Sequence, residues 1–517
     1  MMRTKYLIFA LAVSGAAVAS AENVYLNGVW EKGKTMKFSD PQAWNSQKGL
    51  LGRLPDKNDV LCIIDRSGYT TVDGQYTFKS LSLGRFLASQ SGIGNITFTL
   101  TKGSSITLDT AVKAKFSTAI SSALETVKNT PQKAPMSRQK LTISGGMVNV
   151  LDSLNPAGTV VFDINVAKSP KTLKGFTGGI DFDCLLNVKN DLLISSKNLA
   201  VYDGIGWQVG EVSFLGRTRL ANAADKKSPY KKFTVAQSQT NYFTPVMIVN
   251  VGNEKHPKAD MKTGDFKFSR GARVNVFGRL EVNGSLDMSW ASELDVKRGG
   301  RLVITSQNIN SFAEFRSDKL ARIRIDGELS VLNPKLTKEN TKFVDVQMVV
   351  GETGSVRIDG TGKDGKSGMY LERSLLSLQK GAKLYARNMV NLGDQTRLQL
   401  FGENQISARE PANGLCRIML RGKDTIVELH ANQKFDSFGG LNARTTLRLC
   451  DGANDVSFVR LFSGNWAKKN GFALNIEGFK NGVVRVAEDS PMIATNVSAR
   501  GWKNFRVENG FLTADAE

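Results

Sequence analysis

The chain has 517 residues, enough for several ordinary domains, and a formal net charge of +21 at pH 7. Its four cysteines fit no zinc or redox spacing, and we expect no transmembrane segment in the mature chain, because no segment after residue 21 approaches the ~20 apolar residues of a span. If the chain is secreted, a charge this basic is expected to associate it with acidic polysaccharide or an anionic cell envelope, without specific recognition of nucleic acid. Solubility alone is the equal alternative explanation of the charge.

Residues 1–21 have the features of a secretory signal peptide. Arg3 and Lys5 supply a positive start, and Tyr6–Val13 is a short apolar run. Ala19–Ala21 is a small-x-small cleavage site. A retained membrane anchor is the alternative, but the apolar run is too short to span a bilayer. We expect Glu22 to begin a mature protein in the periplasm, at the cell surface or outside the cell, with a charge of 21 − 2 = +19.

Residues 22–60 are expected to form an N-terminal cap, because an open solenoid end exposes strand edges and core. Trp30 and Trp44 would cover that end, with sugar stacking as an alternative role. A Pro-x-x-x-Asp-Val step follows at Pro55–Val60. Short strands are then predicted at 61–65, at 70–74 (TTVDG) and at 78–84, which ends in S-L-x-L-G.

This succession resembles the start of large secreted bacterial β-solenoid proteins, among them passenger-like proteins with autotransporter-associated β-strand repeats. The similarity extends from about Trp44 to the end of the chain. It implies a right-handed parallel β-helix at the cell surface or in the surrounding matrix. The chain departs from autotransporters because its last residues, Phe511–Glu517, lack a terminal aromatic and follow no block of barrel strands. We therefore expect no terminal membrane barrel.

One helix is predicted, over Ala111–Lys128. Its apolar residues fall on one face at helical spacing, and Pro131 and Pro135 end it. We interpret it as an insertion that packs on the side of the solenoid, with a partner-binding helix as the alternative.

The clearest repeats lie in Arg270–Thr305. Pairs of apolar residues two positions apart recur at steps of 6, 6, 8 and 8 residues, starting at Val274, Leu280, Leu286, Leu294 and Leu302. Side chains alternate between the two faces of a strand, so each short strand buries one face and exposes the other. Three such strands make a coil of roughly 20–25 residues, which suits a stacked repeat architecture.

Similar units recur along the chain, and the predicted fold class is all-β: a right-handed parallel β-helix, or β-solenoid, with one inserted helix. A sandwich or barrel of loosely similar strands is the alternative. The solenoid is expected over residues 61–470, with basic loops near 221–232 and 252–265. Residues 471–517 would form the closing coils and a C-terminal cap that contains Trp502 and Phe505.

Basic residues often precede the first buried residue of a predicted strand. If stacking aligns them on one face, they form a cationic ladder matched to a linear polyanion. Acidic residues such as Glu281, Asp287, Glu293, Asp295 and Glu328 would instead make the surface a solvated mixture of charges. The candidate ligand-binding residues are Arg273, Arg279, Arg301, Arg322, Lys383, Arg397 and Arg417.

Two cysteines, Cys416 and Cys450, lie on strand-like runs and would meet if those runs stack in neighbouring coils. A secreted protein permits a disulfide there. Buried free thiols are the equal alternative, since cysteine packs well in a core.

Motifs for chemistry are absent from the sequence or unspecific. His256 and His430 are interpreted as surface or strand-end residues, and the Gly204–Gly210 run lacks the helix of a dinucleotide loop. The loop Asp359–Gly368 fails the spacing of a calcium site. We therefore assign no catalytic residue, metal or cofactor.

The sequence favours a secreted, non-enzymatic structural or adhesin-type protein that binds acidic polysaccharide. The alternative is a carbohydrate-active enzyme on the same fold, similar to the β-helix polysaccharide lyases, which take a proton with Arg or Lys beside a bound cation. Self-assembly through exposed coil ends is a third hypothesis.

Overall fold

The computed structural model describes residues 22–517, apart from a set of segments between strands. These are residues 27–34, 47, 64–67, 84–94, 110–138, 152–158, 165–176, 197–208, 222–229, 238–246, 269–271, 290–291, 306–308, 313–320, 334–340, 361–367, 387–389, 408–415, 441–442, 462–470 and 487–495. The predicted signal peptide, Trp30 and the predicted helix at Ala111–Lys128 all lie outside the described residues.

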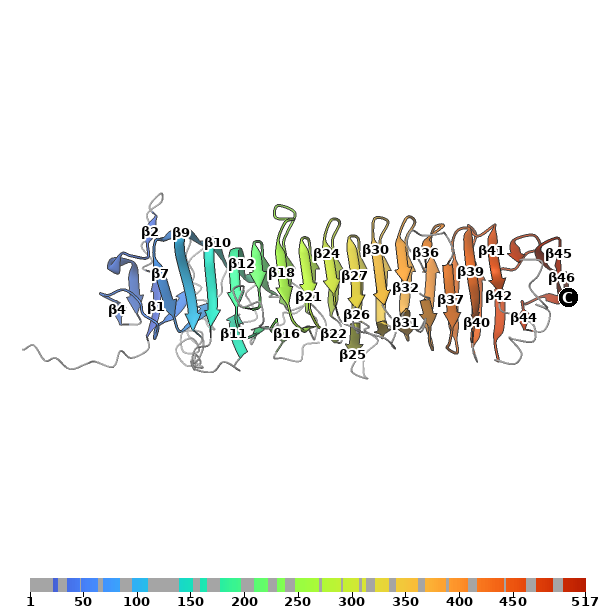
Figure 1. Ribbon diagram of the computed structural model, residues 1–517, viewed down its shortest axis with the longest axis horizontal. Helices are drawn as coiled ribbons and strands as arrows, with labels where there is room; N and C mark the ends of the chain where they lie inside the picture. The colour runs from blue at the N-terminus through green and yellow to red at the C-terminus, as the bar shows by residue number, and fades with distance from the viewer. Residues whose placement is uncertain are drawn as a thin grey trace, which may run out of the picture.

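The described chain is all-β and elongated, with short strands stacked in parallel along one axis (Figure 1). In the regular part, each strand pairs with the strand three places later in the chain, so that three consecutive strands make one coil. Equivalent residues lie 20 positions apart between Arg273 and Glu293 and 29 between Glu293 and Arg322. The predicted solenoid-like stacking is therefore confirmed, with a coil length that varies more than the sequence pattern suggests.

In the regular part of the solenoid, each coil contributes one strand to each of three faces. The first face contains β2 (Met36–Lys37), β6 (Gly68–Val72), the first halves of β9 (Asn95–Asp109), β10 (Gln139–Leu151) and β12 (Thr177–Val188), then β14 (Val209–Phe214), β17 (Met247–Val251), β20 (Arg273–Val276), β23 (Glu293–Val296), β26 (Ala321–Ile325), β29 (Val346–Val350), β32 (Leu375–Leu378), β35 (Arg397–Leu400), β38 (Thr425–Leu429), β40 (Arg444–Leu449), β42 (Ala473–Glu477) and β44 (Val497–Ser498).

The second face ends before the C-terminal coils. It contains β7 (Gln75–Phe78), the second halves of β9, β10 and β12, then β15 (Arg217–Arg219), β18 (Asp260–Thr263), β21 (Arg279–Val282), β24 (Arg301–Ile304), β27 (Glu328–Asn333), β30 (Ser355–Gly360), β33 (Lys383–Ala386) and β36 (Gln405–Ser407). Beyond β36, the Gln433 side chain bonds the backbone of Asn404 in both directions, at 3.2 Å each.

The third face consists of two sheets in succession. The first contains β1 (Asn23–Leu26), β5 (Val60–Ile63), β8 (Ser80–Leu83), β11 (Thr159–Ile164), β13 (Asp191–Ser196), β16 (Phe233–Gln237), β19 (Phe266–Phe268), β22 (Leu286–Ser289) and β25 (Ile309–Phe312). The second contains β28 (Thr341–Val344), β31 (Met369–Glu372), β34 (Val390–Leu392), β37 (Cys416–Leu420), β39 (Gln433–Gly440), β41 (Val456–Leu461) and β43 (Val484–Val486).

The core runs the length of the solenoid. All ten apolar residues predicted to point inward between Val274 and Ile304 are buried. Equivalent aromatic residues stack on one another between coils, as Phe233 and Phe266 do with ring centroids 4.7 Å apart. Offset and edge contacts of this kind add to the free energy of burial.

Four successive corners between the third and first faces use a non-glycine residue with positive φ: Asp345, Arg373, Gln395 and Asp424, at 46° to 58°. A buried Ser or Thr follows soon after each of the last three. The Ser374 hydroxyl, for example, donates to Glu372 O at 2.7 Å. These hydroxyls satisfy corner carbonyl groups that no strand can reach.

The N-terminal end is closed by antiparallel strands. β3 (Trp44–Ser46) pairs with β1 and with β4 (Gly49–Leu50), after a short 3₁₀ turn at Pro41–Ala43. Trp44 is fully buried against Phe38 and donates from Nε1 to Phe38 O at 3.1 Å.

The C-terminal end is closed by a hairpin of β45 (Trp502–Glu508) and β46 (Phe511–Ala516), and β46 also pairs with β43. Phe479 of the last coil contacts Trp502 and Phe505 of this cap edge-on. Within the described residues, no α-helix is present and no helix is long and apolar enough to span a membrane.

The interior stack predicts a large loss when one ring is removed. Phe266→Ala should lower the free energy of unfolding by about 3–5 kcal/mol, because the neighbouring coils cannot close the cavity. Denaturant unfolding measures this effect. Tyr69→Ala, at a side chain that is 67 % exposed, should change stability by no more than ~0.5 kcal/mol. Equal losses in the two variants would contradict the aromatic stack as a source of stability.

Candidate functional site

The structure distributes the seven predicted basic residues over all three faces. Arg273 and Arg397 begin strands of the first face, and Arg322 is the second residue of β26 on the same face. The second-face residues are Arg279, Arg301 and Lys383, and Arg417 lies in β37 on the third face. Among these seven, Arg279 and Arg301 are direct neighbours in register.

Carboxylates separate most of these cations. Glu293 lies in register between Arg273 and Arg322, and it accepts a hydrogen bond from Arg273 Nε at 2.6 Å. Arg279 pairs with Glu281 at 2.8 Å, and Arg301 pairs with Glu328 at 3.1 Å. The described surface is therefore a mixture of charges of the kind that the sequence left open, and a ligand-binding role for the seven residues stays a prediction.

A buried carboxylate organises the outer surface near the C-terminal coils. Glu428 of β38 is 2 % exposed and accepts bonds from Arg397 Nη2 at 2.5 Å, from Gln399 Nε2 at 2.7 Å and from Arg448 Nη1. Burial opposes ionisation of Glu428, but the bonds from Arg397, Gln399 and Arg448 outweigh it and lower its pKa to about 2. Arg448 continues the network to Glu477 at 2.7 Å.

The side chains of Cys450 and His430 lie beside Glu428 without forming a catalytic relay. Cys450 Sγ is 3.9 Å from His430 Nε2, and the same nitrogen is 4.0 Å from Glu428 Oε2. A relay needs the base to use one ring nitrogen toward the nucleophile and the other toward the carboxylate. The pKa of Cys450 is raised, mainly by burial and then by Glu428, which opposes formation of the thiolate.

Cys450 is a free thiol, so the disulfide to Cys416 that the sequence left open is not formed in this structure. The two residues belong to different faces: Cys416 lies in β37 on the third face and Cys450 follows β40 on the first. Cys62 and Cys184 are buried free thiols, and burial raises the pKa of each to about 12.

Most of the surplus positive charge lies outside the described residues. The described residues contain 41 Lys and Arg and 35 Asp and Glu, a net charge of 41 − 35 = +6. The rest of the chain contains 28 basic and 13 acidic residues, a net charge of 28 − 13 = +15. The stacked strands are therefore close to electrical balance, while the segments that connect them are strongly basic.

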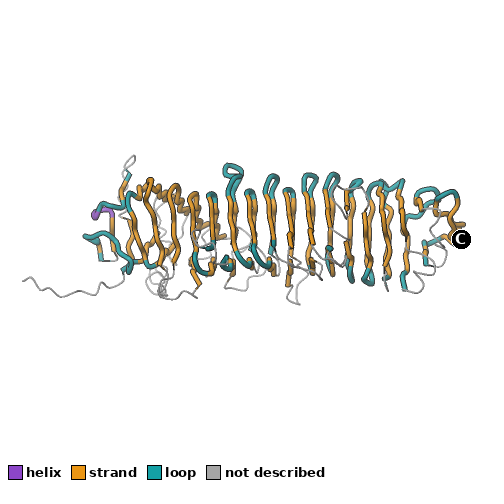
Figure 2. The backbone as a smooth tube through the Cα atoms, viewed as in Figure 1, coloured by secondary structure: helices purple, strands orange, loops and turns teal. Residues whose placement is uncertain are grey.

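The corners between the first and second faces are described without interruption from β14 to β36, and they line one edge of the molecule (Figure 2). Their lengths differ. Lys297–Gly300 and Gly351–Gly354 are four residues long, whereas Asp326–Gly327, on the coil between them, has only two. The short corner leaves a depression between the two longer ones, and we call this depression the notch.

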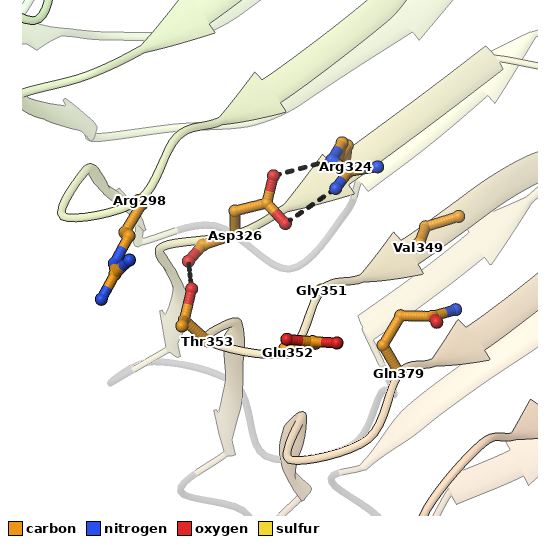
Figure 3. A pocket seen from close by; sticks show the side chains of 8 residues that line it. All are labelled: Arg298, Arg324, Asp326, Val349, Gly351, Glu352, Thr353 and Gln379. Carbon is orange, nitrogen blue, oxygen red and sulfur yellow. Dashed lines mark hydrogen bonds and ion pairs between the residues drawn. The ribbon is translucent and has the colours of Figure 1, made fainter.

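The notch has a volume of about 540 Å³. It is lined by polar side chains from three longer corners and by the short corner at its base (Figure 3). The lining residues are Arg298, Arg324, Asp326, Val349, Gly351, Glu352, Thr353 and Gln379.

Charges inside the notch are only partly compensated. Asp326 binds Arg324 at 2.7 Å, and its backbone O accepts from Thr353 Oγ1 at 2.7 Å. Arg298 makes no hydrogen bond or ion pair with the other lining residues (Figure 3). The Arg298 cation and the Glu352 carboxylate therefore line the notch without a partner among the other lining residues, and the Gln379 amide lines it while its Nε2 donates to Ser377 Oγ at 3.2 Å.

A side chain at position 351 would disturb the wall of the notch. A Cβ at Gly351 would lie 1.9 Å from Asp326 Oδ1, so a side chain there would displace the carboxylate that holds Arg324. Single-sequence reasoning missed the notch, because it depends on corner lengths in three consecutive coils. Once the register of the coils is known, the Gly-containing corners are the sequence signal that locates it.

The two basic segments noted in the sequence differ in the structure. Residues 252–265 contain a corner at Gly252–Ala259 followed by β18, and the corner places His256 Nε2 3.5 Å from Asp183. Residues 222–229 of the other segment lie outside the described residues.

Within the described residues, no group of three or more His, Cys, Asp or Glu side chains is arranged to hold a metal ion. Comparison of the chain with protein-family models, with curated proteins and with solved structures gave no match in any of the three.

The Glu428 network predicts a pH-dependent stability. The folded pKa of about 2 lies below the usual value of 4.5, so the contribution is complete above pH 4.5 and is lost as the pH falls toward 2. Glu428→Gln should lower the free energy of unfolding at pH 7 by about 1.5–3 kcal/mol, because Arg397 and Arg448 lose their charge-assisted hydrogen bonds to a buried carboxylate. Unfolding curves between pH 2 and 7 measure both effects.

Glu477→Gln is the matched control, because Glu477 bonds the same Arg448 but is 45 % exposed. Its cost should stay within ~1 kcal/mol. A Glu428→Gln protein with unchanged stability and an unchanged acid transition would show that the buried carboxylate contributes nothing.

Proposed function

We propose that this chain is an exported, non-enzymatic β-solenoid that acts as a structural or adhesin-type protein at a cell surface or in the matrix. We propose further that it binds acidic polysaccharide and that the notch is the contact point. The observation that carries this proposal is the Arg298 guanidinium, which makes no hydrogen bond or ion pair with the other residues that line a polar notch on the edge of a repeating scaffold.

The chemistry of the notch suits an acidic sugar. A guanidinium binds a carboxylate or sulfate through paired hydrogen bonds. Sugar hydroxyls donate to a carboxylate such as Glu352 and accept from an amide such as Gln379. Val349 adds one apolar contact for a ring face.

The charge distribution supports the same partner. Without Arg3 and Lys5 of the predicted signal peptide, the segments outside the described residues carry a net charge of 15 − 2 = +13, and long-range attraction by this charge raises the rate at which a polyanion reaches the surface. The described strand faces are nearly neutral, so we attribute the attraction of an acidic polymer to the basic connecting segments. A row of aligned cations along one strand face is not needed for it. Three further points remain parts of the proposal: that the coil is right-handed, that the protein is exported through the predicted signal peptide, and that it resembles autotransporter passengers.

Binding to a uronic-acid polymer should depend on Arg298. Arg298→Ser should weaken binding of oligogalacturonate or alginate oligomers by about tenfold or more, since a hydrogen bond to a charged group is worth about 1.5–3 kcal/mol. Titration calorimetry at two salt concentrations measures this effect. The wild-type affinity should fall as salt rises, because the contact is electrostatic.

Arg322→Ser is the matched control, because Arg322 is equally cationic and 68 % exposed but is not among the residues that line the notch. It should leave the affinity within about twofold. Equal losses from both variants would make the binding a general charge effect and would overturn the notch as the site. Growing ultraviolet absorbance from unsaturated uronate, with or without Ca²⁺, would replace the proposal with a lyase.

A further inference from the structure

Asp59 is a fully buried carboxylate at the start of β5, inside the N-terminal cap. Arg53 donates hydrogen bonds to this carboxylate from both terminal nitrogens, Nη1 at 2.6 Å and Nη2 at 2.9 Å. The backbone N–H of Asp56 donates to it at 2.8 Å. A carboxylate at this depth is retained only when its hydrogen-bonding capacity is filled.

The main-chain nitrogen of Glu22 is a further donor to this carboxylate. It lies 3.3 Å from Asp59 Oδ1, and Glu22 O accepts from Val60 N at 2.8 Å. The next residue, Asn23, is in parallel register with Val60. The backbone of Glu22 is thus fixed by two hydrogen bonds, one from its N–H to the buried Asp59 carboxylate and one from Val60 N to its carbonyl oxygen.

Among the described residues, the ionised side chains around this nitrogen are unbalanced in charge. Three carboxylates face it or its partners: Asp59, Asp56 and the Glu22 side chain. Two cations oppose them: Arg53, which is 3.6 Å from Asp56, and Lys48, which is 3.8 Å from Glu22. One more positive charge at the Glu22 nitrogen would balance three carboxylates with three cations.

Cleavage at the predicted signal-peptide site would supply that charge. Hydrolysis of the peptide bond between residues 21 and 22 adds one water. The carboxylate stays on Ala21, and the α-amino group of Glu22 takes up a proton at neutral pH.

We propose that the α-ammonium group of Glu22, released when the signal peptide is removed, forms an ion pair with the buried Asp59 and locks the N-terminal cap. The inference rests on the export that forms part of the proposed function. Before cleavage the same nitrogen is a neutral amide that makes one long hydrogen bond. After cleavage it is a cation beside a buried carboxylate, and such charge-assisted bonds are roughly twice as strong.

The sign of the pH dependence follows from the partner. An α-amino group ordinarily titrates near pH ~8, and a carboxylate at contact distance raises its pKa. The added stability should be complete below pH ~8 and should disappear as the pH rises through the raised value. Arg53 and Lys48 are unchanged by cleavage, so they do not imitate a difference between the cleaved and uncleaved N-termini.

The test compares two proteins with defined N-termini. One begins at Glu22 with a free amine, and the other retains Ala19-Ser20-Ala21 in front of Glu22. Urea unfolding is measured at pH 7 and at pH 10.5, in the wild-type sequence and with Asp59→Asn. We expect the free-amine protein to unfold at a higher midpoint at pH 7. The difference should vanish at pH 10.5 and in Asp59→Asn.

NMR titration of the α-amino group in the protein beginning at Glu22 gives a second readout that needs no variant. We expect a pKa at least one unit above ~8. It decides the question if Asp59→Asn does not fold. Equal midpoints at pH 7 for the two N-termini, together with an ordinary α-amino pKa, would overturn the proposal.

N-terminal sequencing of the exported protein tests cleavage separately. A first residue other than Glu22 would also overturn the inference. Loss of polyuronate binding would count against the proposed function only, because the midpoints and the amine titration do not depend on a ligand.

Discussion

Parallel stacking of coils is the constraint on which the rest of this structure depends. Strands of successive coils lie about 4.8 Å apart, so each side chain has an equivalent position directly above and below it. Inside, the repetition favours apolar and aromatic stacks such as Phe435 on Phe458, whose centroids are 5.1 Å apart. Outside, like charges would repel along the whole row. The alternation of Arg273, Glu293 and Arg322 resolves that conflict.

This constraint acts on the strand faces and not on the corners between them, so the two kinds of surface differ in how their charges are paired. On the strand faces, side chains of successive coils lie next to one another, and many cations there pair with a carboxylate. Glu428, which is 2 % exposed, accepts hydrogen bonds from Arg397 and Arg448 in this way. At the corners the chain leaves the register, and segment lengths change from coil to coil. Arg298 lies at such a corner, and it makes no ion pair with the other residues that line the notch. The same reasoning explains why the connecting segments carry most of the net charge.

The sequence predicts the repeating interior because that information is local. The alternation that begins at Val274 and ends at Ile304 identifies each buried face, and the structure buries all of those residues. The sequence does not reveal the loss of the second face after β36, where Gln433 replaces a strand partner. That change depends on which coil lies next to which, over separations of 20 residues and more. Similarly, Asp59 is recognisable as part of a Pro-x-x-x-Asp-Val step, but its burial under Arg53 is a long-range property of the cap.

The candidate site was less predictable than the fold, for a related reason. The seven basic residues were chosen by their position within single strands, whereas their grouping depends on the face that each strand occupies. Arg279 and Arg417 therefore lie on different faces. The notch arises from a two-residue corner at Asp326–Gly327 between two four-residue corners, and each corner alone is an ordinary Gly-containing turn. Its location follows only when three coils are placed in register.

The central claim is that the chain binds its ligand at the corners, because cations on the strand faces are paired with carboxylates of the same faces. The most direct measurement is hydrogen exchange and covalent arginine labelling of the full mature chain, with and without a bound polyuronate. The account predicts protection that is concentrated at Arg298 and in residues 351–354 and 379, with little change at Arg273 and Arg322. Protection that follows the strand rows instead, or no protection at the notch when the polymer is bound, would contradict it.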